Sequence, residues 1–150
     1  MSIFYIHHAY VVVDVMNIGN AFAEKSFDCV FASDLIEHLN KEDGLKLIAM
    51  MERIARKKVI IYTPNGFLPQ GEVDNNPAQI HRSGWTVNEM KLLGYNRIIG
   101  INGWKPIRGE LAKIRLSPQF IWERISLLSQ PIVKRFPKYA FHILCIKDIV

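Results

Sequence analysis

Residues 27–40 read FDCVFASDLIEHLN, and this stretch decides which fold the chain can adopt. Its first half is a mainly apolar run of the kind that forms a buried strand in a parallel sheet. Its second half holds Asp34, Glu37 and His38 within five positions, without an intervening glycine or proline. Polar side chains directly after such a strand can be solvated loop residues, the start of a helix, or a functional site.

Strand and helix patterns alternate on both sides of this stretch. Short apolar runs predict strands at residues 10–15, 27–33, 59–63, 97–101 and 140–146. Apolar residues at helical spacing and capping pairs predict helices that begin at Asn40, Thr86 and Ser117. This order predicts an α/β layered fold with a mostly parallel sheet.

The last predicted helix raises two further expectations. Pro131 should end or kink it, because proline lacks the amide hydrogen that a helix interior needs. Its apolar stripe is formed by Ile121, Ile125, Leu128 and Ile132. Such a stripe favours packing against the core over contact with a membrane.

Bulk composition favours one globular domain. Hydrophobic residues make up 49% of the 150-residue chain and charged residues 22%, and no window approaches 18 uninterrupted apolar residues. The first residues lack the basic and small-residue pattern of a secretory signal, so a cytoplasmic location is expected. Residues 64–84 are rich in turn formers and without periodicity, which is typical of a lid or binding loop.

The positive charge is concentrated in one segment. Residues 103–138 hold eight lysines and arginines against two acidic residues, whereas the formal charge of the whole chain is +5. A basic segment with aromatic residues can favour nucleic acid, other phosphate-bearing partners or a membrane surface. The favoured interpretation here is a basic helical insertion at about 103–138 with a solvated face.

Five motifs in order resemble the class I S-adenosylmethionine-dependent methyltransferases, in particular the type 11-like group. They read VVVDV, KSFDCVFASDLIEHL, KKVIIYTPNG, HRSGWTVNE and the pair Gly94-Tyr95. The resemblance covers about nine-tenths of the chain. It implies a Rossmann-like sheet with the strand order 3-2-1-4-5-7-6, in which the last strand is antiparallel, and S-adenosylmethionine as the cofactor.

The resemblance begins at the third strand of that family. No glycine precedes Gly19, so the glycine-rich turn that approaches the cofactor in the family is missing from this sequence. We therefore expect a single partial domain over 1–150, N-terminally truncated, with strands 3 to 7 of seven. Loss of the central first strand would open one edge of the 27–33 strand, near Val30 and Phe31. Either the 10–15 strand pairs there, or self-association or a partner chain covers the edge.

The resemblance also implies cofactor-binding residues. Asp14 matches the acid that accepts a hydrogen bond from the adenine amino group, with apolar contact to the ring from Val15 and Met16. Three further residues lie at the carboxyl end of the 27–33 strand, where open α/β sheets bind ligands. These are Ala32, Ser33 and Asp34.

Three interpretations of Glu37 and His38 remain open. They can pack in the wall of the site, as the histidine of the EHL motif commonly does in this family. They can be the catalytic residues, one of them removing the acceptor proton as a general base. They can also bind Mg²⁺, Mn²⁺ or Zn²⁺ with Asp34 and His81, a set similar to that of metal-dependent small-RNA 2′-O-methyltransferases, with Asp34 in place of a glutamate.

The acceptor side is predicted to include His81 and Trp85, which follow the long loop and could close over a substrate. The predicted function is methyl transfer from S-adenosylmethionine to an unidentified acceptor, with a small molecule favoured, by this chain alone or as part of a larger or split protein. The alternative is a non-catalytic methyltransferase-like remnant or interaction module that does not bind the cofactor alone.

Overall fold

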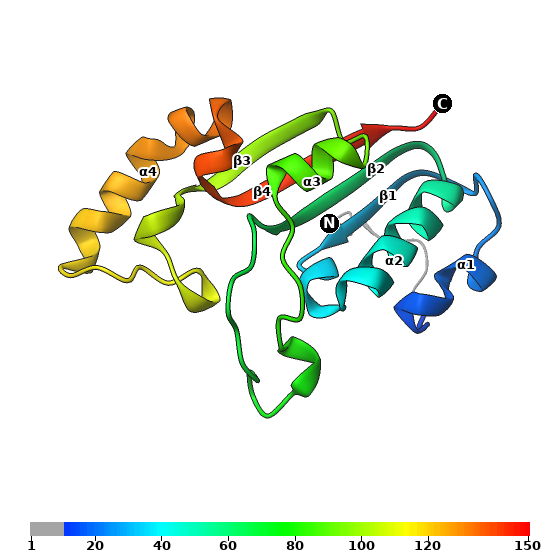
Figure 1. Ribbon diagram of the computed structural model, residues 1–150, viewed down its shortest axis with the longest axis horizontal. Coiled ribbons are helices and arrows are strands. Elements are labelled where there is room, and N and C mark those ends of the chain that lie inside the picture. Colours follow the sequence, from blue (N-terminus) through cyan, green and yellow to red (C-terminus); the bar gives the residue numbers. More distant parts are fainter. Residues whose placement is uncertain (1–10) are drawn as a thin grey trace, which may run out of the picture.

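A computed structural model describes residues 11–150 as one mixed sheet with helices packed on it. The strand order is β1-β2-β4-β3 (Figure 1). The strands are β1 (Phe27–Ser33), β2 (Ala55–Pro64), β3 (Arg97–Trp104) and β4 (Ala140–Asp148). β1 and β2 are parallel, while β4 runs antiparallel to both of its neighbours.

This order matches the 4-5-7-6 part of the expected sheet, including the antiparallel last strand. The α/β fold class and the incomplete Rossmann-like sheet are therefore confirmed. β1 pairs with β2 and with no other strand among residues 11–150, so it forms one edge of the described sheet. The side chain of Phe31 on this strand is 59% exposed.

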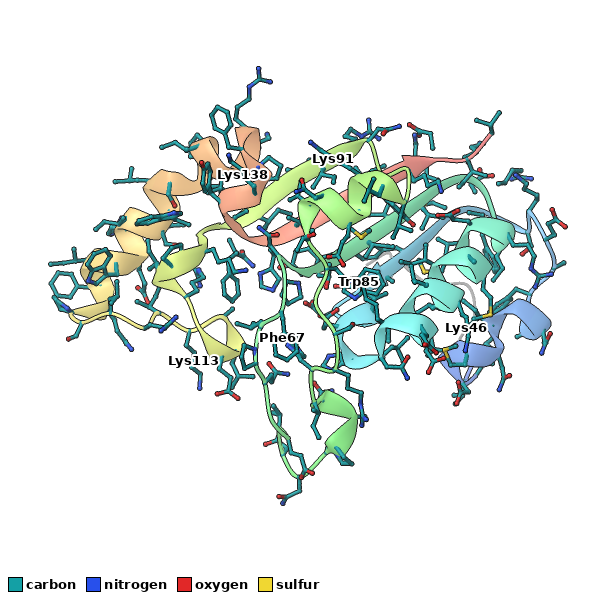
Figure 2. All side chains as sticks on the ribbon, in the orientation of Figure 1. Lys46, Phe67, Trp85, Lys91, Lys113 and Lys138 are labelled. Carbon is teal, nitrogen blue, oxygen red and sulfur yellow. The ribbon has the colours of Figure 1, made fainter. Side chains whose placement is uncertain are left out.

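Two helices and the sheet enclose the core. The α-helices are α1 (Ile18–Ala21), α2 (Lys41–Ile54), α3 (Val87–Leu92) and α4 (Gln119–Arg135). α2 and α3 lie on the same face of the sheet (Figure 1). Their apolar residues pack with alternate residues of β2 and β4 and with Trp85, which is fully buried (Figure 2). No helix within residues 11–150 is long and apolar enough to cross a membrane.

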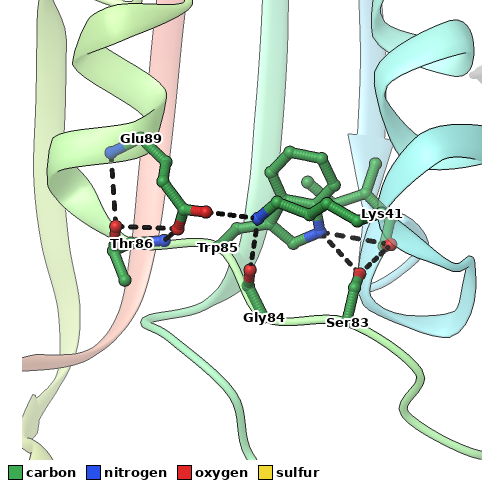
Figure 3. Close-up of polar contacts among 7 residues, drawn as sticks. Lys41, Ser83, Gly84, Trp85, Thr86 and Glu89 are labelled. Atoms are coloured by element: carbon green, nitrogen blue, oxygen red, sulfur yellow. Dashed lines mark hydrogen bonds and ion pairs between the residues drawn. The ribbon is translucent and has the colours of Figure 1, made fainter.

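Local capping signals fix the helix starts as predicted. The side chain of Asn40 accepts a hydrogen bond of 2.9 Å from the backbone N–H of Asp43. Thr86 and Glu89 form a complete capping box at the start of α3 (Figure 3). Gly94 follows α3 with a φ of +89°, the left-handed conformation expected after a helix end.

The predicted strand at 10–15 is wrong for its described residues. Residues 11–14 form no regular structure, and η1 (Val15–Asn17), a 3₁₀ turn, follows; Tyr10 lies outside the described residues. The carboxylate of Asp14 accepts the backbone N–H of Met16 at 2.7 Å, which stabilises a turn at this point. None of residues 11–15 pairs with β1, so the expected pairing of the 10–15 segment with the 27–33 strand is also wrong for the described residues.

Other boundaries also differ from the sequence-based expectations. β2 begins at Ala55 rather than at residue 59, and its Arg56 forms an ion pair with Asp28 of β1. α4 continues through Pro131 to Arg135. Of the four residues in its predicted core stripe, Ile121, Leu128 and Ile132 are exposed and Ile125 is half-buried. The expectation that this stripe packs in the core is therefore wrong.

The long loop is present and its two ends are held together. Residues 64–84 contain one 3₁₀ turn, η3 (Pro77–Gln79). The backbone N–H of Gly66 donates to the carbonyl of Trp85 at 2.8 Å. Gly84 permits the two backbones to touch, since a Cβ there would lie 2.2 Å from the backbone nitrogen of Phe67. The loop therefore leaves the fold and returns to it at almost the same point.

Candidate functional site

A cavity of about 360 Å³ opens at the carboxyl ends of β1 and β2. The loop 64–84 supplies part of its wall through Leu68, Gln70 and His81. The other polar residues that line it are Asp34, Glu37, His38, Tyr62, Gln79, Asn102 and His142. The structure thus brings together four residues that the sequence analysis had selected, namely Asp34, Glu37, His38 and His81.

A sharp turn after β1 places Asp34 at the mouth of this cavity. Its φ of +46° is in the left-handed region, and its backbone N–H donates to the carbonyl of Tyr62 at 3.0 Å. The hydroxyl of Ser33 donates to its carboxylate at 3.1 Å. Partial burial raises the pKa of Asp34, although its side chain remains about half exposed.

Glu37 lies below Asp34 in η2 (Ile36–His38), and its side chain is almost fully buried. One carboxylate oxygen, Oε2, accepts a hydrogen bond of 2.9 Å from the hydroxyl of Thr63. The other oxygen, Oε1, is buried without any partner among the described residues. Burial is the main cause that raises the pKa of Glu37 to about 7, and the negative charge of Asp34 adds to it. Both protonation states are therefore accessible near neutral pH.

His38 and His81 meet edge to face beside Glu37, with their ring centroids 4.8 Å apart. Nδ1 of His81 lies 2.7 Å from the carbonyl of Leu68, and Nδ1 of His38 lies 3.3 Å from the carbonyl of Ile80. A carbonyl can only accept, so each neutral ring carries its proton on Nδ1 and keeps a lone pair on Nε2. Burial lowers the pKa of His81, which favours this neutral form.

Ligand atoms of Glu37, His38 and His81 all lie within 4.8 Å of one another. One carboxylate and two neutral imidazoles are a donor set that transition-metal cations accept. The Nδ1 contacts with backbone carbonyls are the kind that orient metal-binding histidines. Asp34, expected as a fourth ligand, is outside this group.

The opposite wall consists of residues that sequence reasoning missed. His142 stacks on Tyr62 with centroids 4.9 Å apart, and its Nδ1 lies 2.9 Å from the side-chain amide of Asn102. Burial, aided by the positive charge of Arg108, lowers the pKa of His142 to about 4. His142 is therefore neutral at pH 7 and makes no ion pair with Asp34, although its Nε2 lies 3.9 Å from that carboxylate. Burial raises the pKa of Tyr62 to about 12.

His142 could have been predicted as a site residue only from the pairing of β2 with β4, which the sequence pattern does not give. The register sets His142 opposite Pro64, at the end of β2 that carries the cavity. A histidine inside the apolar run AFHILCI is usually a core residue, so the run alone did not indicate a site.

Trp85, predicted to contact the acceptor, does not line the cavity. Its ring is fully buried, and its Nε1 donates to the carbonyl of Ile36 and to the hydroxyl of Ser83 (Figure 3). These contacts hold the end of the loop against η2. We correct its role from substrate contact to anchoring of the site.

The residues predicted to bind the cofactor divide between two places. Val15 and Ala32 line a separate apolar pocket of about 240 Å³ between α1, α2 and β1, with Phe31 and Leu35. Asp34 lines the polar cavity, Ser33 is exposed and contacts Asp34, and Met16 is half-buried beside Asp14 in η1. Asp14 is exposed. The structure thus does not gather all six residues in one pocket.

Comparison with known proteins agrees with this fold. Residues 4–63 match the sequence profile of the family described as "Methyltransferase domain". The crystal structure of a SAM dependent methyltransferase from Archaeoglobus fulgidus superposes with a TM-score of 0.53 and 17% sequence identity. The match covers 92% of this chain and 66% of that chain. No curated protein matches the sequence.

Proposed function

Because the chain carries a methyltransferase domain sequence over residues 4–63 and the Rossmann-like fold of class I S-adenosylmethionine-dependent methyltransferases, we propose that it takes part in methyl transfer to an acceptor in the polar cavity. S-adenosylmethionine is the cofactor that both likenesses imply, and it supplies the methyl group. The chain spans 66% of the length of the similar solved structure. The acceptor class that best suits a cavity of this size is a small molecule.

The observation that carries this proposal is the buried carboxyl of Glu37. A group with a pKa of about 7 is suited to take a proton from an acceptor hydroxyl or amine at neutral pH. Oε1, which is buried and has no hydrogen-bond partner among the described residues, is the oxygen that would take up this proton. Asp34 and His81 border the same cavity and would orient the acceptor, since methyl transfer depends strongly on alignment.

The described residues fit only one side of the cofactor. The apolar pocket with Val15 and Ala32 suits an adenine ring, and Oδ2 of Asp14, which forms no hydrogen bond with the described part of the chain, could accept a hydrogen bond from its amino group. No glycine-rich turn occurs beside this pocket in residues 11–33, where Gly19 of α1 is the single glycine. The methionine side of the cofactor therefore has no matching residues here, and we derive no chemical step through it.

Calorimetric titration with S-adenosylmethionine tests the cofactor site. We expect binding in the micromolar range, and at least about tenfold weaker binding for Val15→Asp, because a buried charge in the apolar pocket is costly. Val11→Asp is the matched control, since Val11 is exposed and outside the pocket. Absence of heat at millimolar cofactor would contradict binding by this chain.

That negative result would favour the second candidate, an interaction module without its own cofactor. The feature that favours it is the edge of β1, which has no strand partner among residues 11–150 and where Phe31 is exposed, so another strand could pair there. Sedimentation analysis distinguishes self-association at this edge from a monomer.

We also propose that Glu37, His38 and His81 bind a divalent cation of the Zn²⁺ or Mn²⁺ type. The support is the unpartnered buried oxygen of Glu37 together with the two oriented imidazoles. In calorimetry with Zn²⁺ or Mn²⁺ alone, His81→Ala is expected to weaken binding at least about tenfold. His142→Asn is the matched control, because His142 lines the same cavity outside the cluster. If His81→Ala and the natural chain bind the cation with equal affinity, the metal site is contradicted, and the role of Glu37 and His38 would be proton transfer or packing.

A further inference from the structure

Helix α4 exposes its apolar face to solvent. Residues at positions 120, 124, 127, 128, 131, 132 and 135 recur at helical spacing, and every one of them is exposed. Four are large apolar side chains, namely Phe120, Leu127, Leu128 and Ile132, with exposed fractions between 60% and 77%. We call these seven residues the outer face of α4. Exposed apolar side chains that gather in one place are typical of an interaction site.

The inner face of α4 combines the buried apolar side chain of Val133 with three polar side chains that form hydrogen bonds. Ser129 accepts the backbone N–H of Trp104 at 2.9 Å, and Gln130 both accepts from Gly103 and donates to the carbonyl of Gly100. Ser126 is buried and accepts from Arg108. The apolar side chains of α4 are therefore divided between its two faces, with Val133 buried on the inner face and four large ones exposed on the outer face.

This orientation is fixed by close backbone contact with β3. A Cβ on Gly100 would lie 2.1 Å from the carbonyl oxygen of Val133, and one on Gly103 would lie 2.3 Å from Oγ of Ser126. Rotation of α4 to bury its outer face would break these contacts and the hydrogen bonds above. The outer face therefore stays exposed to solvent as long as α4 packs on β3.

Basic residues lie on the outer face and in the segments next to it in sequence. Arg124 and Arg135 belong to it, and four further exposed cations lie nearby in sequence, namely Lys113, Arg115, Lys134 and Lys138. Figure 2 shows Lys113 and Lys138 well apart on the side of the molecule that carries α4. Within residues 103–138 the exposed acidic residues are Glu110 and Glu123, and none of the six cations forms an ion pair with a described residue.

The position of α4 argues against a strand partner as its occupant. α4 packs on β3, at the edge of the sheet opposite β1 (Figure 1). A chain that pairs with β1 would therefore lie at the opposite edge of the sheet and would not cover α4. A symmetric second copy would bring the arginines of one outer face near those of the other, which like-charge repulsion disfavours.

We propose that the outer face of α4 docks the protein on an anionic lipid surface. The apolar side chains enter the boundary between headgroups and acyl chains, while the arginines and lysines extend to lipid phosphates. The cavity at β1 and β2 is separate from this face, so docking is independent of the proposed methyl transfer. It would keep the protein beside acceptors that reside in or near the membrane.

Vesicle sedimentation of the full chain, without cofactor, tests this inference. We expect binding to phosphatidylcholine vesicles that contain phosphatidylserine at least about tenfold stronger than to pure phosphatidylcholine, with loss at high salt. The double variant Leu127→Gln with Leu128→Gln should lose most of this binding, and so should Arg124→Glu with Arg135→Glu. Leu92→Gln on α3 is the matched control, because Leu92 is even more exposed, at 89%, and lies outside the face.

Three results would overturn the proposal. One is absence of vesicle binding, and another is equal binding to both kinds of vesicle. The third is unchanged binding of the Leu127 and Leu128 variant. A dimer in sedimentation that this variant converts to a monomer, together with no vesicle binding, would assign the face to a second copy instead.

Discussion

Trp85→Ala is expected to lower the free energy of unfolding by about 3–5 kcal/mol, the usual cost of removing a fully buried large aromatic side chain. The indole ring fills the space over Gly44 of α2, where a Cβ would lie 2.5 Å from its Cζ2. Its Nε1 also holds Ile36 and Ser83, and the Lys41 ammonium lies 3.7 Å from the ring centroid (Figure 3). Truncation therefore leaves a cavity and removes two hydrogen bonds.

Urea unfolding measures this change, with Leu92→Ala as the control. Leu92 is 89% exposed, so its truncation should change stability by less than about 0.5 kcal/mol. The loss of unfolding free energy for Trp85→Phe should lie between those of Trp85→Ala and Leu92→Ala. Phenylalanine retains an aromatic ring, but it cannot donate the hydrogen bond to the carbonyl of Ile36. A loss below about 1 kcal/mol for Trp85→Ala would contradict the anchoring role.

The second large effect concerns pH. The pKa of Glu37 is about 7 in the folded chain and near its ordinary value of 4.5 in the unfolded chain. The folded state therefore binds the proton more tightly, and stability falls as pH rises between these two values. Glu37 alone should cost about 3 kcal/mol of unfolding free energy between pH 4.5 and pH 8. This loss is complete above the folded pKa and absent below the unfolded one.

Glu37→Gln stays neutral and should not show this decline. The measurement is the difference in unfolding free energy between the natural chain and the variant from pH 5 to pH 8, with a chelator present to exclude bound cations. Glu24→Gln, at an exposed glutamate, is the control and should follow the natural chain. Parallel curves for Glu37→Gln and the natural chain would show that the Glu37 carboxyl is hydrated rather than buried.

Local signals predicted local structure well. The side chains of Asn40, Thr86 and Glu89 satisfy backbone groups within three residues, so their effect can be predicted without the rest of the fold. The strand order was different, because it came from the resemblance and not from the strand patterns themselves. It proved right for the four strands that the structure describes.

The errors have a common physical cause. The spacing of residues in the sequence shows which side chains share a face, but not whether that face points to the core, to the cavity or to solvent. Helical periodicity in 121–132 predicted a face on α4, but it could not show that the face points away from β3. Trp85 follows His81 closely in sequence, yet the chain turns between them, so one lines the cavity and the other enters the core. His142 reaches the site only through antiparallel pairing with a strand about 80 residues earlier.

The two ends of the loop 64–84 lie together at the edge of the core. The middle of the loop lines the cavity and takes no part in the core. Contacts of Gly66, Gly84 and Trp85 hold its ends together, and the entropic cost of closing a loop grows by only about 0.6 kcal/mol for each doubling of its length. Insertions or replacements between residues 70 and 79 would reshape one wall of the cavity and leave the core intact. Descendants of this chain could thus acquire new acceptors by exchanging a short peptide segment, without rebuilding the protein around it.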